Sequence, residues 1–138
     1  MALDNPPKTI FSRIVDREIP AVIVYEDNDT MAFLDHNPVS AGHLLVIPKI
    51  TVDHLDDCSP ETYAAIFKTV YLVSKQIKNK LQPERVALVV HGYDVPHAHV
   101  HVIPSYDRND LAFPKRPSIL PTTAELQAVA ESLKYKSV

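Results

Sequence analysis

The sequence predicts an α+β domain in which about five antiparallel strands are packed by one long helix on one face. Short runs rich in β-branched residues, separated by turn residues, predict the strands. A long amphipathic run that ends at Leu81 predicts the main helix, and shorter helical patterns lie near each end of the chain. The 138 residues, of which 46% are hydrophobic, are enough for one core without help from metals or disulfides.

The first elements are a short N-terminal helix and a hairpin. Residues 9–17 place four apolar side chains on one helical face, and Thr9 is a candidate N-cap. Runs 22–26 and 31–34 flank the turn residues 27–29, which predicts a β-hairpin. The helix's apolar face consists of Ile10, Phe11, Ile14 and Val15.

Three further strands and the long helix follow. Residues 43–47 are nearly all apolar, which predicts a central strand covered on both faces. Ser59 can cap the long helix, and Pro60 suits its first turn. Residues 85–90 predict another buried strand, and residues 97–103 predict the last one. The predicted buried face of the helix consists of Phe67, Val70, Ser74, Ile77 and Leu81.

The C-terminal part differs in composition from the rest. Residues 104–121 contain four prolines, which predicts an extended arm. A threonine can then cap a final helix that carries Leu126, Val129, Ala130 and Leu133. We expect one domain over residues 1–138, with a core at 9–104 and the arm and C-terminal helix at 105–138.

Composition limits the setting and the partners. The net charge of −3 and the lack of a dense Lys/Arg run give no support for binding polymeric nucleic acid. Residues 1–8 are polar and lack the apolar core of a signal peptide, and no run approaches the roughly 18 apolar residues of a membrane span. The one cysteine, Cys58, excludes an intrachain disulfide. We therefore expect a cytoplasmic protein without a membrane partner.

Three histidines alternate along the last predicted strand. His97, His99 and His101 would lie on one face about 6.6 Å apart, with the residues between them facing the core. Imidazole has an unperturbed pKa of about 6.5, so it exchanges protons near neutrality. A single histidine would suit a structural role, but three at strict alternation favour chemistry. Metal binding stays open, with further ligands available among Asp35, His36, His43 and His91.

Several segments together resemble one known family. Residues 97–103 resemble the His-x-His-x-His motif of the histidine triad (HIT) superfamily. Residues 9–20, 25–35 and 42–49 resemble that family's opening helix, first hairpin and following strand, in the same order. The resemblance is greatest to the Hint-like branch of nucleotide-binding hydrolases, and it implies a HIT-like fold without a cofactor or a required metal.

The resemblance implies catalytic roles for four histidines. His99 matches the nucleophile, which attacks the α-phosphorus of a nucleoside phosphate derivative and forms a nucleotidyl-histidine that water resolves. His101 matches a residue that hydrogen-bonds phosphoryl oxygens and assists proton transfer, His97 one that orients the nucleophile, and His43 a supporting histidine. This chemistry needs a neutral nucleophile beside a protonated neighbour. A shared hydrogen-bond network would give the histidines this unequal protonation.

The resemblance also implies a nucleotide-binding set. Asp35 lies eight residues before His43, the spacing of the family's ribose-binding acid. His91 stands where Hint-like proteins carry an Asn, and the loop 91–96 is shorter than theirs. The positions that match the base pocket, where plain core packing is the alternative role, are Ile10, Phe11, Ile14, Phe33, Leu34 and His36.

These matches predict a homodimeric nucleoside 5′-phosphoramidate or acyl-nucleotide hydrolase that acts on AMP or GMP derivatives. A dinucleoside polyphosphate hydrolase is an alternative, although such enzymes often follow the triad with Pro-Arg and this chain has Pro104 and Ser105. A hexose-1-phosphate nucleotidyltransferase would carry Gln at the position of His101. A purine-nucleotide-binding module with little turnover is the alternative from another class.

Overall fold

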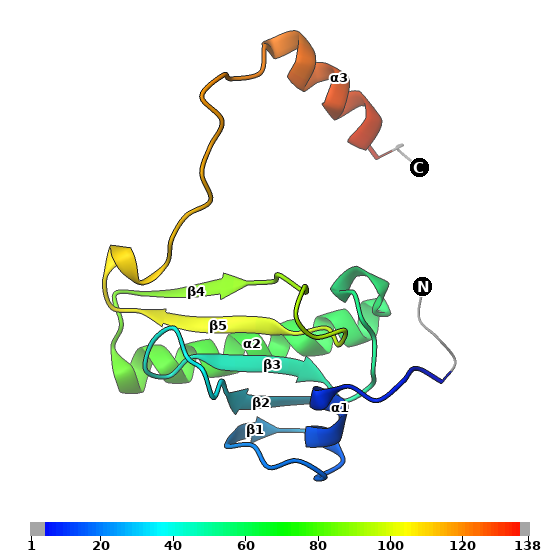
Figure 1. Ribbon diagram of the computed structural model, residues 1–138, viewed down its shortest axis with the longest axis vertical. Coiled ribbons are helices and arrows are strands. Elements are labelled where there is room, and N and C mark those ends of the chain that lie inside the picture. The colour runs from blue at the N-terminus through cyan, green and yellow to red at the C-terminus, as the bar shows by residue number, and fades with distance from the viewer. Residues whose placement is uncertain (1–4, 136–138) are drawn as a thin grey trace.

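The computed structural model describes residues 5–135. The first four residues of the polar N-terminal segment and the last three of the 105–138 segment lie outside this range. One sheet forms the centre of the molecule, with the long helix α2 across one face and the short helix α1 at the other (Figure 1). An extended arm carries the C-terminal helix α3 away from this body (Figure 1).

The sheet has five strands in the order β1-β2-β3-β5-β4, and every neighbouring pair is antiparallel. The predicted α+β fold with a five-stranded antiparallel sheet is therefore confirmed. The central strand β3 is buried along its whole length, as its apolar run predicts. The strands are β1 (Ile23–Glu26), β2 (Thr30–Leu34), β3 (Leu44–Pro48), β4 (Arg85–Val89) and β5 (Val100–Ser105).

The helices begin at the predicted caps. The side chains of Thr9, Ser59 and Thr122 each accept a hydrogen bond from a backbone N–H in the first turn, which satisfies a donor that the helix leaves free. The helices are α1 (Ile10–Val15), α2 (Pro60–Leu81) and α3 (Thr123–Leu133), with two short 3-10 turns, η1 (Leu55–Asp57) and η2 (Arg108–Asp110).

The sheet separates two apolar clusters. The α2 face holds Ala32, Leu44, Val46, Val100 and Val102 against Ile66, Val70, Val73 and Ile77. The α1 face holds Phe11, Ile14, Met31, Phe33, Leu45 and Ile47. Because side chains alternate along a strand, β2 and β3 each supply both clusters.

The buried stripe of α2 is shifted from the predicted one. It consists of Ile66, Thr69, Val70, Val73 and Ile77. Leu81 of the predicted stripe is 43% exposed at the end of the helix. Thr69 takes a place in the core because its hydroxyl lies 2.6 Å from that of Thr30 in β2, which gives both buried polar groups a partner.

Two predicted strands need correction. β4 is an edge strand rather than a buried one, and Leu88 and Val90 are about half exposed. β5 begins at Val100 rather than at His97. The reason is that the backbone N–H of Ala98 donates to the carbonyl of Val52, outside the sheet ladder.

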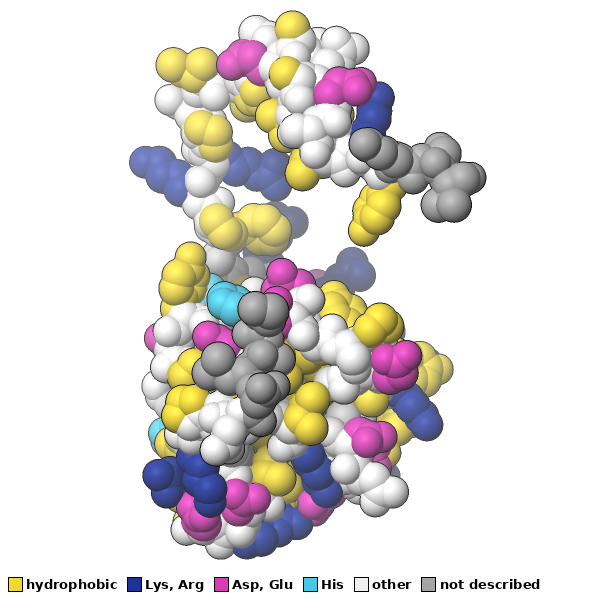
Figure 2. All heavy atoms as spheres, turned by 90° about the vertical axis from the view of Figure 1, so that its right-hand side faces the viewer, with side chains coloured by type: hydrophobic (Ala, Val, Ile, Leu, Met, Phe, Trp, Pro, Cys, Tyr) yellow, Lys and Arg dark blue, Asp and Glu magenta, His cyan; other side chains and the backbone are white. Residues whose placement is uncertain are grey.

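The arm and α3 stand apart from both clusters. Every residue of α3 is exposed, and Figure 2 shows hydrophobic side chains of this region uncovered above the body. Within residues 5–135, no helix is both long enough and apolar enough to cross a membrane.

Candidate active site

The candidate site lies on the α1 face, where four ring systems form a row. The ring centroids of Phe11 and His99, of His99 and His101, and of His101 and His43 are each 5.1 Å apart. His101 lies in β5, His43 directly precedes β3, and Phe11 comes from α1. His97 touches the row through Phe11, at 5.9 Å. The structure thus brings all four predicted catalytic histidines together.

His97 is completely buried and has a partner at each ring nitrogen. Its Nε2 lies 2.8 Å from the carbonyl of Pro48, and its Nδ1 lies 3.0 Å from the hydroxyl of Thr9. A carbonyl can only accept, so Nε2 carries the proton and Nδ1 accepts from the hydroxyl. Burial lowers the pKa of His97, which favours this neutral form. The prediction that His97 lies on the open face of the strand is wrong, because this residue precedes the strand and faces the interior.

His99 has one engaged and one free nitrogen. Its Nδ1 lies 2.7 Å from the carbonyl oxygen of His97 and must donate to it. In the neutral ring the proton is then on Nδ1, and Nε2 keeps its lone pair. No described residue provides a hydrogen-bond partner for Nε2, although the His99 side chain is only 6% exposed. This arrangement presents an unprotonated imidazole nitrogen, which is the form that a nucleophile requires.

His43 and His101 form a directed hydrogen-bond chain. The backbone N–H of Val39 donates to Nδ1 of His43, at 3.0 Å. The proton of neutral His43 therefore sits on Nε2, which donates to Nδ1 of His101 at 2.9 Å. Neutral His101 then carries its own proton on Nε2.

Burial also decides the charge of this pair. Burial, with His99 and His43 nearby, lowers the pKa of His101 to about 4, although Asp35 opposes the shift. Burial lowers the pKa of His43 as well. The expectation of a protonated neighbour beside the nucleophile is therefore wrong for the free protein. The hydrogen bonds instead place the proton of a neutral ring on Nδ1 in His99 and on Nε2 in His101.

Asp35 lies beside this pair at the end of β2. Its Oδ2 is 3.5 Å from Nε2 of His43, and its Oδ1 accepts from the backbone N–H of Asn37 at 2.9 Å. The backbone N–H of Asp35 donates to the carbonyl of His43, at 2.9 Å. One carboxylate oxygen thus shapes the loop, while the other stays next to the histidine pair.

Asp35, His43 and His101 could also be considered as metal ligands. One ligand atom from each lies within 4.8 Å of the others, and two histidines with one carboxylate suit a transition metal. The hydrogen bonds argue against this use. The N–H of Val39 occupies one nitrogen of His43, and the other carries a proton that bonds to His101. A metal here would have to displace that proton and break the pair.

The apolar nucleotide-binding candidates separate into two groups. Phe11, Ile14 and Phe33 pack together on the α1 face, and Ile10 is 47% exposed on the same helix. Leu34 is not brought to this cluster. It lies over the α2 face, in an apolar hollow of about 180 Å³ that also includes Leu44, Ile77 and Leu81.

The two remaining candidates are exposed histidines. His36 follows Asp35 in the loop after β2. His91 follows β4 and packs edge-on against the ring of Tyr93, with centroids 4.8 Å apart. His91 and His99 line the same hollow, of about 190 Å³, together with Asp53, His54, Leu55, Asp56, Val90, Gly92 and Ala98.

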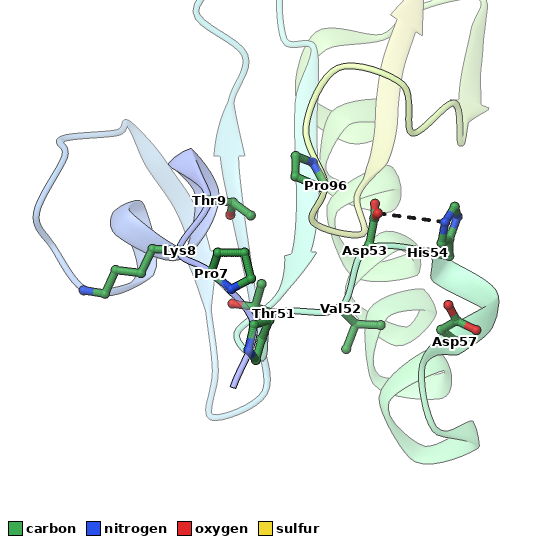
Figure 3. Close-up of a pocket in the computed structure, with 10 residues that line it drawn as sticks. Pro7, Lys8, Thr9, Thr51, Val52, Asp53, His54, Asp57 and Pro96 are labelled. Atoms are coloured by element: carbon green, nitrogen blue, oxygen red, sulfur yellow. Dashed lines mark ion pairs between the residues drawn. The ribbon is translucent and has the colours of Figure 1, made fainter. Parts of the chain in front are cut away.

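A larger hollow of about 400 Å³ lies beside the start of α1 (Figure 3). Thr9, Thr51, His54 and Pro96 are among the residues that line it, and none of the four candidate catalytic histidines does. Figure 3 shows Asp53 facing His54, with Oδ2 of Asp53 and Nε2 of His54 3.9 Å apart.

Sequence reasoning missed several groups that shape the site. The carbonyls of Pro48 and His97 and the N–H of Val39 are backbone groups, which leave no trace in residue type. Thr9 was identifiable as a helix cap, but its bond to a histidine 88 positions away was not. Asp53 precedes the short turn η1 and Asp56 lies in it, and neither belongs to a recognisable sequence pattern.

Comparison with known proteins shows the family of this chain. The family model of the HIT domain matches residues 16–108. The purine nucleoside phosphoramidase of Escherichia coli is 32% identical over 102 residues, covering 70% of this chain and 86% of that protein. The adenylylsulfatase HINT3 of Arabidopsis thaliana is 34% identical over 107 residues, covering 74% of this chain and 54% of that protein.

A solved structure extends the similarity to nearly the whole chain. The crystal structure of a HIT family member from Bacillus subtilis superposes with a TM-score of 0.86 at 29% identity, covering 96% of this chain and all of that one. With the family match spanning more than half of the sequence and the histidine row in place, this chain belongs to the HIT family.

Proposed function

We propose that this protein is a nucleotide hydrolase that cleaves nucleoside 5′-phosphoramidates or acyl-nucleotides through a covalent nucleotidyl-His99 intermediate. The observation that carries the proposal is the proton placement at His99: Nδ1 donates to the carbonyl of His97, which leaves the lone pair on Nε2. Membership of the HIT family, and a relative named purine nucleoside phosphoramidase, support hydrolysis of nucleotides as the reaction class.

The reaction proceeds in two displacements. Nε2 of His99 attacks the α-phosphorus, a bond forms between nitrogen and phosphorus, and the bond from phosphorus to the leaving amine or acyl oxygen breaks. His101 carries its proton on Nε2 and is the donor for the leaving group. Water then attacks the same phosphorus, the bond to His99 breaks, and the nucleoside monophosphate departs with the proton balance restored through His101.

The nucleoside part is assigned to the groups around Asp35 and α1. The carboxylate of Asp35 can accept hydrogen bonds from both ribose hydroxyls. Ile10, Phe11, Ile14 and Phe33 give an apolar wall for the base. The exposed side chain of His36 lies next to Asp35 at the same edge. We therefore propose AMP and GMP derivatives as substrates, without a metal or cofactor.

We assign the leaving group of the substrate to the hollow of about 190 Å³ that His91 and His99 line. Two acidic residues, Asp53 and Asp56, and two further histidines, His54 and His91, are among the residues that line it. Two carboxylates would repel the negative chain of a dinucleoside polyphosphate, and also a sulfate. This charge pattern favours the phosphoramidate over the polyphosphate as the substrate.

We also propose a homodimer in the cytoplasm. β4 is an edge strand with unpaired backbone groups, and Leu88 and Val90 are about half exposed beside it. Edge strands with apolar side chains are ready to pair with another chain. The free thiol of Cys58 supports a reducing compartment. Light scattering after size exclusion will test the assembly, and a monomer at micromolar concentration would contradict it.

Turnover of adenosine and guanosine 5′-phosphoramidates tests the function. The wild-type protein is expected to release the amine with and without EDTA, and a quenched reaction should contain protein that is heavier by one nucleotidyl group on His99. Turnover that persists in His99→Ala would remove the mechanism, and loss with EDTA would favour a metal enzyme. Binding of AMP without turnover would favour a binding module.

A further inference from the structure

We propose that Thr9 is a positioning residue for the nucleophile: its hydroxyl holds His97 in one tautomer and thereby fixes the carbonyl that orients His99. This inference rests on the proposed function and adds to it a residue 88 positions away from the first triad histidine. Thr9 is a positioning residue because it acts through His97 and does not touch the reacting atoms.

The hydrogen-bond distances around Thr9 favour one assignment, because its hydroxyl oxygen lies 3.0 Å from Nδ1 of His97 and 3.5 Å from the other acceptor in reach, Oγ of Ser12. The hydroxyl oxygen accepts from the backbone N–H of Ser12 at 3.0 Å, which caps α1. The single hydroxyl proton is then free to donate to Nδ1 of His97, at 3.0 Å. Nδ1 needs a donor, because the proton of the neutral ring is used on Nε2 by the carbonyl of Pro48. His97 is completely buried, so its two ring nitrogens depend on partners from the protein.

Two routes lead from Thr9 to His99. Along the first, the ring of His97 is held at both nitrogens, and the carbonyl of the same residue accepts from Nδ1 of His99 at 2.7 Å. Along the second, the cap at Thr9 sets the start of α1, and Phe11 packs edge-on against His97 and His99. The hydroxyl therefore controls both the hydrogen-bond acceptor and the aromatic wall of the nucleophile.

The cap alone does not explain a threonine here. Asp, Asn and Ser cap helices as well as Thr does, since capping needs only an acceptor. Position 9 needs an acceptor for Ser12 and a donor for His97 in one short side chain. Serine meets both requirements, ionised aspartate meets only the first, and valine meets neither. These three substitutions separate the cap from the link to His97.

The test measures turnover and proton placement in the full-length protein. Thr9→Ser is expected to keep kcat within about threefold, whereas Thr9→Asp should lower kcat by at least about tenfold at unchanged KM and similar Tm, because a misdirected nucleophile loses rate rather than binding. Imidazole ¹⁵N spectra should show His97 as a neutral Nε2–H ring in the wild type and as a doubly protonated ring in Thr9→Asp. Ser12→Ala removes a cap partner but keeps the hydroxyl, and it should keep kcat within about threefold.

Two outcomes would overturn the proposal. One is a Thr9→Asp protein with wild-type kcat, and the other is a His97 tautomer that does not respond to Thr9→Asp. Thr9→Val, expected to lose both kcat and Tm, is interpreted only beside Thr9→Ser. If the wild-type protein shows no turnover, the proposed function fails, and the ¹⁵N spectra of His97 and His99 still decide this inference. In that case the inference about Thr9 requires that Thr9→Asp shifts the proton of His99 away from Nδ1, as seen in its ¹⁵N spectrum.

Discussion

The two faces of the sheet are built from the same strands and both carry apolar clusters, but the α1 face also carries the candidate catalytic histidines. On the α2 face, Val46, Val100 and Val102 are completely buried among aliphatic side chains. On the α1 face, His99 and His101 alternate with those valines and join His43. Because side chains alternate along a strand, one residue packs in the core and its neighbour in sequence lies in the candidate site.

The faces also differ in how their polar groups are satisfied. The α2 face has one buried polar pair, between Thr30 and Thr69. On the α1 face, both ring nitrogens of His97 and of His43 have hydrogen-bond partners, while Nε2 of His99 has none among the described residues. Nε2 of His101 also has no partner among the described residues, so the network leaves a lone pair at His99 and a proton donor at His101 for the substrate.

Adjacent substitutions test this division most strongly. His99→Ala is expected to lower kcat by on the order of 10⁴-fold with little change in the free energy of unfolding, since it removes the nucleophile. Val100→Ala, one residue later on the α2 face, should cost about 2 kcal/mol of stability through the cavity it leaves and should keep kcat. Phosphoramidate turnover and urea denaturation measure the two effects. A Val100→Ala protein that is stable but inactive would contradict the division.

The next test concerns the hydrogen bond between His43 and His101. His43→Ala leaves Nδ1 of His101 without its donor, so the proton can move to that nitrogen and leave Nε2 bare. We expect kcat to fall about 10²-fold, the range of one general acid, while KM stays within a few-fold. Tyr71→Ala is a control, because this aromatic side chain is 61% exposed on α2, away from the candidate site. Equal kcat in wild type and His43→Ala would show that His101 keeps its proton by other means.

Local patterns predicted the elements but not every strand end. Thr9, Ser59 and Thr122 cap their helices, and each cap is a rule about neighbouring residues. The alternation of the triad histidines also predicted a strand from residue 97. β5 starts three residues later because Ala98 bonds to Val52, a partner that lies 46 positions away and has no sequence pattern.

The candidate site shows the same limit. The triad and His43 could be found from residue type and spacing, and the fold brings them together. The face on which a base-pocket candidate lies depends on the pleat of its strand, and this places Phe33 and Leu34 on opposite faces. The expected protonated neighbour failed because burial, which lowers the pKa of His101, is a property of the packed structure.

Asp35 gives a test of substrate binding on the α1 face. Asp35→Asn keeps the shape of the side chain but replaces one acceptor oxygen by a donor, so the ribose hydroxyls lose a strong acceptor. We expect KM for adenosine phosphoramidate to rise about tenfold, with kcat changed less. The wild type should discriminate between the ribose and 2′-deoxyribose substrates, and the variant should not. If the variant keeps the full preference for ribose, Asp35 does not bind the sugar.

The burial of histidines on one face predicts how stability changes with pH. The unfolded chain binds a proton at His101 near the ordinary pKa of 6.5, whereas the folded protein binds it only near pH 4. Between these values the unfolded state holds more protons, so stability falls as the pH decreases from about 6.5 to about 4, by up to about 1.4 kcal/mol per pH unit for this group. Urea denaturation across this range should give a shallower slope for His101→Asn. Identical slopes would show that the titration of His101 does not differ between the two states.

The smallest effect is expected at Leu34, which was a base-pocket candidate by sequence. The structure places it 38% exposed in the apolar hollow of the α2 face, with Leu44 and Ile77. Leu34→Ala should therefore cost about 1 kcal/mol of stability, because only part of the side chain leaves an apolar contact, and KM should be unchanged. Phe33→Ala, one residue earlier on the α1 face, should raise KM. If Leu34→Ala raises KM by as much as Phe33→Ala, residues of both faces affect binding of the base. The division between a catalytic face and a packing face then holds only for the histidines.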